Sequence, residues 1–198
     1  MGKRELSQRN IWQDVSGKNA KKSEDLFYRL FLSYLQNTQY RIINKPKEFK
    51  TIYVDFLLST KDSQEIYNPK QKITRHGISP DFAILNVKTQ KTIYIEIKRQ
   101  DGWIENTTRQ AGRGNAHERM CKYFTPGLLK ILRNKSKINA GLPFWIIFFG
   151  NITRDPCRVR EITCWFDNYH HNFYFWRDAQ NPIDIIEHFD NHIKSLLD

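Results

Sequence analysis

The sequence predicts a single α/β domain over residues 1–198, with a central mixed sheet of about five strands flanked by helices. Residues 143–149 form a continuous apolar run of strand length, which is typical of a central strand buried on both faces. Residues 81–86 and 92–98 are rich in β-branched and aromatic side chains, and the short polar loop between them predicts a hairpin. Amphipathic segments near both ends of the chain supply the flanking helices.

The N-terminal elements follow from periodicity and from turn residues. Apolar side chains recur on one face of residues 24–36, so a helix is expected there, with Ser23 as its N-cap. Short strands are expected at residues 40–43 and 52–58, on either side of a lysine-rich loop. Residues 59–78 are polar and basic, and we expect them to form a loop that leads into the hairpin.

The C-terminal third is expected to contribute two further strands and a closing helix. Residues 161–166 and 172–176 have the composition of strands. Residues 182–197 predict a helix that begins at Pro182 and carries its apolar side chains on one side. No repeat or low-complexity segment divides the chain, so one domain is expected.

The charge balance favours a polyanionic partner. Lysine and arginine number 32 against 21 acidic residues, which gives a net charge of +11 and a pI near 9.6. Because aromatic residues make up 14% of the chain, a folded DNA-binding domain is favoured over a basic tail. Three cysteines (Cys121, Cys157 and Cys164) have no metal-ligand spacing and are expected to be packing residues in a reducing cytoplasm. No signal sequence or membrane-spanning stretch is evident, so a soluble protein without a membrane partner is expected.

The hairpin carries the residues with the clearest chemical meaning. Fourteen residues separate Asp81 from Glu96, and Lys98 follows two positions later. In an antiparallel pairing, Asp81 is expected nearly opposite Lys98 and diagonal to Glu96, within roughly 5 to 8 Å between Cβ atoms. Because side chains alternate along a strand, Glu96 and Lys98 share a face with Tyr94, while the isoleucines face the core. The charged face is then expected to be open to a substrate.

Two carboxylates and a lysine suit a metal-dependent phosphodiesterase. Carboxylates bind a hard divalent ion such as Mg²⁺, which retains several waters and contacts a phosphate oxygen. Lys98 would hold the attacking water or the phosphate. The alternative is that Glu96 and Lys98 form a solvated strand face and that Asp81 is a turn residue after Pro80.

A second group of residues points to nucleic acid. Residues 111–119 begin as a glycine-rich loop and are expected to enter a helix with Asn115 as its N-cap. Arg113 can bond guanine through two hydrogen bonds, and asparagine can bond adenine in the same way. The alternative is a structural junction with solvated arginines. His117 could contact phosphate or pack inside the protein, and packing is the simpler expectation.

These segments closely resemble the MunI family of type II restriction endonucleases, within the PD-(D/E)xK nuclease superfamily. The likeness is strongest over residues 79–130 and 143–176 and weaker in the N-terminal third and the tail. Gly114 to Arg119 carries the Gly-Asn-Ala-x-Glu-Arg pattern that the family shares with EcoRI. The segments that carry the resemblance are residues 79–84, 96–103, 111–119, 124–130, 152–156 and 158–163.

The resemblance implies a restriction-endonuclease-like core and a homodimer that hydrolyses palindromic double-stranded DNA. The implied site is CAATTG, cut after the first C to leave 5′-AATT overhangs and 5′-phosphate ends. Mg²⁺ is the implied cofactor, for which Mn²⁺ can substitute. A cognate DNA methyltransferase would protect host DNA without contacting this protein. The resemblance leaves the DNA-wrapping contacts of residues 59–78 undefined.

The resemblance also implies residue roles. Asp81, Glu96 and the backbone carbonyl of Ile97 would be the metal ligands, and Lys98 the catalytic lysine. Arg113 would read the outer C·G pair. The inner AATT would be read by Asn115, Ala116 and Arg119, with Gly114 and His117 completing the DNA-binding segment.

Palindromic DNA gives the homodimer a physical reason, because two identical half-sites match a two-fold axis. Residues 126–132 have apolar side chains that could form the dimer contact or belong to the core. Two other functions remain open: a basic DNA-binding module with a structural acidic cluster, and another nuclease of the superfamily that acts on junctions or damaged DNA.

Overall fold

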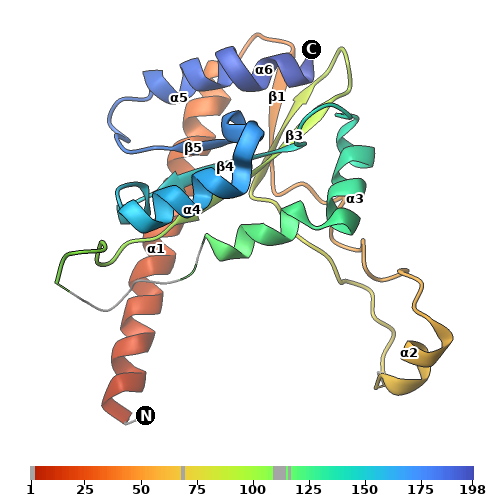
Figure 1. The fold of residues 1–198 in the computed structure, drawn as a ribbon. Coiled ribbons are helices and arrows are strands. Elements are labelled where there is room, and N and C mark those ends of the chain that lie inside the picture. The colour runs from red at the N-terminus through yellow and green to blue at the C-terminus, as the bar shows by residue number, and fades with distance from the viewer. Residues whose placement is uncertain (1–2, 68–69, 109–114, 116) are drawn as a thin grey trace.

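A five-stranded mixed sheet forms the centre of the molecule (Figure 1). The structure is a computed structural model that describes residues 3–67, 70–108, 115 and 117–198, with the backbone alone for residues 3–16. The strand order is β1-β2-β3-β4-β5, with β1, β2 and β3 antiparallel and β3, β4 and β5 parallel. The strands predicted at residues 40–43, 81–86, 92–98, 143–149 and 172–176 are confirmed, as β1 Tyr40–Asn44, β2 Phe82–Asn86, β3 Thr92–Arg99, β4 Phe144–Phe149 and β5 Phe173–Phe175.

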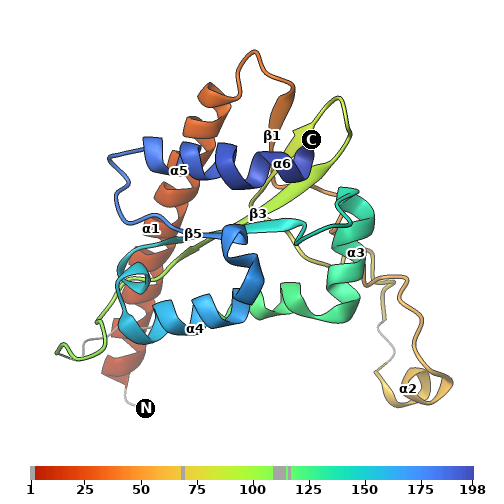
Figure 2. The same cartoon turned by 45° about the horizontal axis from the view of Figure 1, so that its top comes forward.

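Helices cover both faces of this sheet. One face packs against α1 and the C-terminal helical segment, and the other packs against α3, α4 and the short helix η1 (Figure 2). The predicted C-terminal helix is confirmed, with a π-helical turn, η4, in its middle. The helices are α1 Lys3–Tyr34, α2 Thr60–Glu65, η1 Glu118–Phe124, α3 Pro126–Ser136, η2 Asn151–Thr153, α4 Pro156–Phe166, η3 Asp167–Asn172, α5 Ile183–His188, η4 Phe189–Ile193 and α6 Lys194–Leu197.

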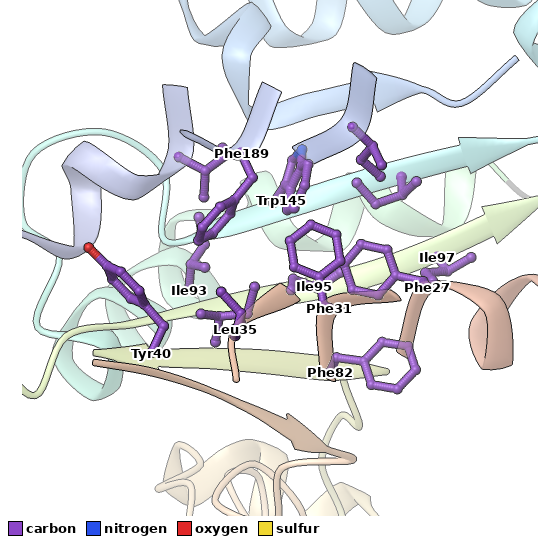
Figure 3. Close-up of a cluster of buried hydrophobic side chains, with 14 of the residues drawn as sticks. Phe27, Phe31, Leu35, Tyr40, Phe82, Ile93, Ile95, Ile97, Trp145 and Phe189 are labelled. Carbon is purple, nitrogen blue, oxygen red and sulfur yellow. The ribbon is translucent and has the colours of Figure 1, made fainter. Parts of the chain in front are cut away.

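An aromatic core joins α1 to the sheet and to the C-terminal helices (Figure 3). Phe31 meets Trp145 of β4 edge-on, with ring centroids 5.8 Å apart, and meets Phe189 edge-on at 5.5 Å. The three rings are fully buried or nearly so. Such contacts add to the free energy gained from burying the rings, and they hold α1 firmly against the strands that carry the charged cluster.

A second core covers the opposite face, which includes the side of β3 that carries Glu96. Tyr94 is 2% exposed and Glu96 only 8%. The expectation of an open charged face is therefore wrong for most of β3, because η1 and α3 pack on it. Leu128 and Leu132 of α3 are buried in this core, which favours the core role for these two positions.

Residues 52–58 do not form the predicted strand. They fold as turns followed by extended chain, and α2 follows within the segment that was expected to be loop. In both Figure 1 and Figure 2 this region reaches away from the sheet, and Phe56 and Leu57 are 66% and 92% exposed. Local apolar composition predicted a strand, but within the described part of the chain no strand lies beside this segment to pair with it.

The helices α4 and α1 show that two further predictions are wrong: the strand at residues 161–166 and the N-cap at Ser23. Residues 161–166 lie in α4 and not in a strand; Asp155 caps this helix and Pro156 occupies its first turn. Their apolar side chains Ile162 and Phe166 are four residues apart, the spacing of a helix face. Ser23 is not an N-cap, because α1 begins at Lys3, and the Ser23 hydroxyl donates to the Asn19 carbonyl oxygen at 3.2 Å.

The three cysteines are exposed, which corrects their expected role in packing. Among the described residues, no helix combines the length and the apolar character needed to cross a membrane.

Candidate active site

The β2–β3 hairpin brings Asp81 and Glu96 together. Phe82 pairs with Ile95, so the next position along each strand places Asp81 opposite Glu96. The sequence had predicted Lys98 as the opposite residue; the observed register differs by two positions. The pairing nonetheless gathers the two carboxylates at the end of the hairpin, and Lys98 follows on the same side of β3 as Glu96.

Asp81 is held by backbone groups on two sides. Its Oδ2 accepts a hydrogen bond from the Ile97 amide at 2.7 Å. Its own carbonyl oxygen accepts from the Lys45 amide at 2.9 Å, which ties the site to the end of β1. Burial raises the pKa of Asp81 above its ordinary value, and the nearby Glu96 carboxylate raises it further. The effect of Glu96 is the repulsion between two close negative charges, and a bound cation would relieve this repulsion.

Glu96 has a partner for each of its carboxylate oxygens. Oε1 forms an ion pair with Lys98 Nζ, and both side chains are largely buried, at 10% and 13% exposed. Oε2 accepts a hydrogen bond from the Tyr123 hydroxyl at 2.9 Å. Lys98 Nζ also lies 3.4 Å from the Ile97 carbonyl oxygen. The ammonium group thus contacts two of the three atoms that were expected to bind a metal.

The oxygen donors present fit a hard divalent ion. Asp81 and Glu96 supply two carboxylates, and the Ile97 carbonyl lies beside the Glu96–Lys98 pair. Within the described residues, no group of three or more His, Cys, Asp or Glu side chains has the arrangement of a metal site. Two carboxylates suit Mg²⁺ in particular, because this ion usually retains waters and binds substrate phosphates with only one or two protein carboxylates.

Two residues near this cluster were not identified as site residues from the sequence. Glu24 of α1 interacts electrostatically with Lys45, Glu96 and Lys98, and burial raises its pKa. A carboxylate three residues before the buried Phe27, on the apolar side of a helix, is the signal that could have revealed it. Tyr123 was not identified either, because nothing local distinguishes its hydroxyl from that of any other buried tyrosine.

The predicted DNA-binding segment is described only in part. Arg113, Gly114 and Ala116 lie outside the described residues. Asn115 is exposed, and its carbonyl oxygen accepts from the Glu118 amide at 3.2 Å. The helical turn begins later than expected, at Glu118, with His117 and not Asn115 at the N-cap position. Arg119 is exposed at the start of η1.

His117 is fully buried, which favours the packing role over a phosphate contact. Its ring stacks in parallel on Trp165 of α4, with centroids 5.4 Å apart and 8° between the planes. Nε2 lies 3.2 Å from a Glu161 carboxylate oxygen. Burial lowers the pKa of His117, and the Arg158 charge lowers it further, so the neutral ring is favoured. The imidazole therefore packs against α4 and anchors the chain just before η1.

Comparisons with known proteins identify the family of the chain. The whole chain, residues 1–198, matches the family model described as type II restriction enzyme MunI. A curated relative from Mycoplasma sp., the type II restriction enzyme MunI, is 47% identical over 202 residues, with 100% of both chains covered. The crystal structure of MunI restriction endonuclease in complex with cognate DNA matches with a TM-score of 0.81 and 46% identity, covering 94% of this chain and 97% of that one. This structural match confirms the expected fold class.

Proposed function

Because the chain belongs to the family of the type II restriction enzyme MunI, and is thus a site-specific deoxyribonuclease, we propose that it cuts palindromic DNA at CAATTG. The proposed cut follows the first C and leaves 5′-AATT overhangs with 5′-phosphate ends. The observation that carries the proposal is the meeting of Asp81, Glu96 and Lys98 at the end of the hairpin.

Asp81, Glu96 and the Ile97 carbonyl are proposed to hold Mg²⁺, with Mn²⁺ as a substitute. The ion would neutralise charge on the phosphate and acidify a bound water. Lys98 is the proposed catalytic lysine, since its ammonium group can orient the water or stabilise the phosphate oxygens. The Ile97 amide keeps the Asp81 carboxylate pointed toward Glu96, and the covered face of β3 limits access of bulk water.

Recognition of the DNA sequence is proposed to depend on the segment that precedes η1. Arg113 is assigned to the outer C·G pair, because guanidinium groups bond guanine O6 and N7 together. Asn115, Ala116 and Arg119 are assigned to the inner AATT, with Gly114 allowing close approach of the backbone to DNA. The exposure of Asn115 and Arg119 supports their assignment, whereas the buried His117 is better placed to support the segment than to contact DNA.

The proposed partner is a second copy of the chain. A two-fold homodimer would place one active site on each strand of the palindrome. We also propose that the enzyme acts in the cytoplasm of a prokaryote, where a cognate methyltransferase modifies the same site and protects host DNA without binding the nuclease.

Cleavage of plasmid DNA in Mg²⁺, followed by sequencing of the fragment ends, tests the proposal. Discrete fragments that begin with 5′-AATTG at every site would support it. Ends at another fixed sequence would refute the assigned site, and nicking that depends on DNA structure would indicate a repair-type nuclease.

The metal-ligand assignment predicts a separation of cleavage from binding. Asp81→Ala or Glu96→Ala should reduce cleavage below detection, because each removes one of the two carboxylates. Both variants should still bind the CAATTG duplex, measured by fluorescence anisotropy. Leu57→Ala, at a 92% exposed site distant from the hairpin, serves as the matched control and should cleave normally. Full activity of either carboxylate variant would refute the assignment.

A further inference from the structure

Tyr123 connects the DNA-binding segment to a catalytic carboxylate. Its hydroxyl donates to Glu96 Oε2 at 2.9 Å, inside the second core, where the tyrosine is 1% exposed. It lies in η1, the seven-residue helix that directly follows the DNA-binding segment and begins with Glu118 and Arg119. The short helix η1 therefore begins at the proposed DNA contacts and reaches the active site near its end.

The tyrosine ring and its hydroxyl have separable roles. The ring packs on Phe144 of β4, with centroids 5.3 Å apart, and phenylalanine could fill the same space. The hydroxyl is needed only for the bond to Glu96. Lys98 pairs with Oε1 of Glu96 and the Tyr123 hydroxyl bonds Oε2. The Tyr123 bond therefore determines the rotation of the carboxylate about the Cγ–Cδ bond of Glu96. Hydrogen bonds to buried charged groups are strong and directional, so this one can set the orientation of Glu96.

The helix η1 also has distinct inner and outer sides. Met120 and Tyr123 are buried and anchor it to the second core, whereas Arg119 faces solvent. Just before η1, the His117 ring stacks on Trp165 of α4. A movement of Arg119 on binding DNA would be transmitted through the helix to the Tyr123 hydroxyl, since the buried side chains leave η1 little freedom to deform.

We propose that Tyr123 is a positioning residue that orients Glu96 for metal binding and couples this orientation to engagement of the DNA-binding segment with its cognate sequence. This inference rests on the proposed function. In physical terms, correct DNA contacts and the divalent ion would favour the same position of η1, so each would strengthen binding of the other.

Tyr123→Phe is the decisive variant, because it removes one oxygen and keeps the ring. Ca²⁺ binding to the protein, without DNA, is measured by calorimetry, and affinities for a CAATTG duplex and for a duplex with one substituted inner base pair are measured in Ca²⁺. We expect Ca²⁺ affinity to fall roughly tenfold, the effect of losing a hydrogen bond to a charged group. We also expect a smaller affinity ratio between the two duplexes and a higher Mg²⁺ requirement for cleavage.

Tyr94→Phe is the matched control. Tyr94 is a buried tyrosine of the same core, and its hydroxyl interacts with Glu48, so this variant should change none of the three measurements. In a Glu96→Gln background, Tyr123→Phe should have no further effect on Ca²⁺ affinity.

Wild-type Ca²⁺ affinity in Tyr123→Phe would overturn the positioning role. Weaker Ca²⁺ binding with an unchanged affinity ratio between the duplexes would overturn the coupling to recognition. Failure of the proposed function would be seen separately, as an inability of the wild-type protein to cut at CAATTG.

Discussion

At the scale of single residues, the environment of a side chain decides its chemistry. Glu96 would be an ordinary solvated carboxylate on an exposed strand, but here both of its oxygens have partners inside a closed core. The same principle applies to His188, whose ring stacks in parallel on Trp145 with centroids 5.6 Å apart. Its Nε2 lies 2.8 Å from the His171 carbonyl oxygen, a contact that requires the ring to donate.

His188 should make the fold sensitive to acid. The pKa of His188 is lowered to about 4, mainly by burial and in smaller part by the neighbouring His192, His171 and His170. A lowered histidine pKa favours the neutral form in the folded state, so stability is complete above pH 6.5 and is lost as the pH falls toward about 4. The loss is expected to reach at most about 3 kcal/mol, measured by urea unfolding across this range.

His188→Gln should flatten this pH dependence, although it lowers stability at every pH because the stacked ring is lost. His170→Gln is the control, since His170 is exposed and should leave the slope nearly unchanged. An identical slope in wild type and His188→Gln would contradict the explanation.

Gly77 provides a test of backbone packing at the base of the segment that reaches away from the sheet. A Cβ at this position would lie 1.9 Å from the Phe49 carbonyl oxygen, so the backbone must move to accept it. Gly77→Ala should lower the free energy of unfolding by about 2 kcal/mol or more. Gly127→Ala is the matched control: a Cβ there meets nothing within 4 Å, in the first turn of α3. Equal stability of the two variants would contradict this account.

At the scale of elements, α4 supports the start of η1. Its Trp165 and Glu161 contact the buried His117, so the position of α4 determines where His117 lies. The start of α4 depends on Asp155, which is 2% exposed. Its Oδ1 accepts from the Cys157 and Arg158 amides at 3.0 and 3.1 Å.

Asp155→Ala should lower the free energy of unfolding by about 2 to 4 kcal/mol, because it removes the cap and leaves three partly buried amides without this acceptor. One of these is the Glu105 amide, which donates to Asp155 Oδ2 at 3.0 Å. Ser59→Ala removes the cap of the exposed helix α2 and should cost less than about 1 kcal/mol. Chemical denaturation of both variants provides the measurement, and a loss at Asp155 no larger than at Ser59 would refute the role of the cap.

At the scale of the whole molecule, the net charge of +11 favours association with DNA before any base is read. The affinity of the Asp81→Ala variant for the CAATTG duplex should therefore fall steeply with salt, by about a hundredfold or more between ~50 and ~200 mM, as expected for several phosphate contacts. Anisotropy titrations with a non-cognate duplex as control should show a comparable slope. An affinity that does not change with salt would contradict a phosphate-dominated interface.

Local patterns in the sequence were sufficient to predict the central strands of the sheet. Alternation in residues 92–98 correctly separated the isoleucines, which face the aromatic core, from Tyr94 and Glu96, which face the other. Continuous apolarity correctly identified β4 as buried on both faces. These features depend on the geometry of a single strand, so neighbouring residues are enough to reveal them.

The secondary-structure predictions were wrong where contacts between residues far apart in the sequence select the structure. Residues 161–166 could form a strand or a helix by composition, and packing of Ile162 and Phe166 against the sheet, with the Asp155 cap, selects the helix. A strand at residues 52–58 is excluded because no partner strand lies beside it.

The sequence alone determined the hairpin, the residue types proposed for catalysis and the basic character of the chain, because these depend on adjacent residues and on composition. Only the tertiary structure decided that Asp81 faces Glu96, that His117 is buried against α4 and that Tyr123 reaches the Glu96 carboxylate. The Asp81–Glu96, Tyr123–Glu96 and His117–Trp165 pairs are 15, 27 and 48 positions apart in the sequence. The first depends on the register of the hairpin, and the other two depend on how the helices pack. Their free energy depends on burial, which no local pattern records.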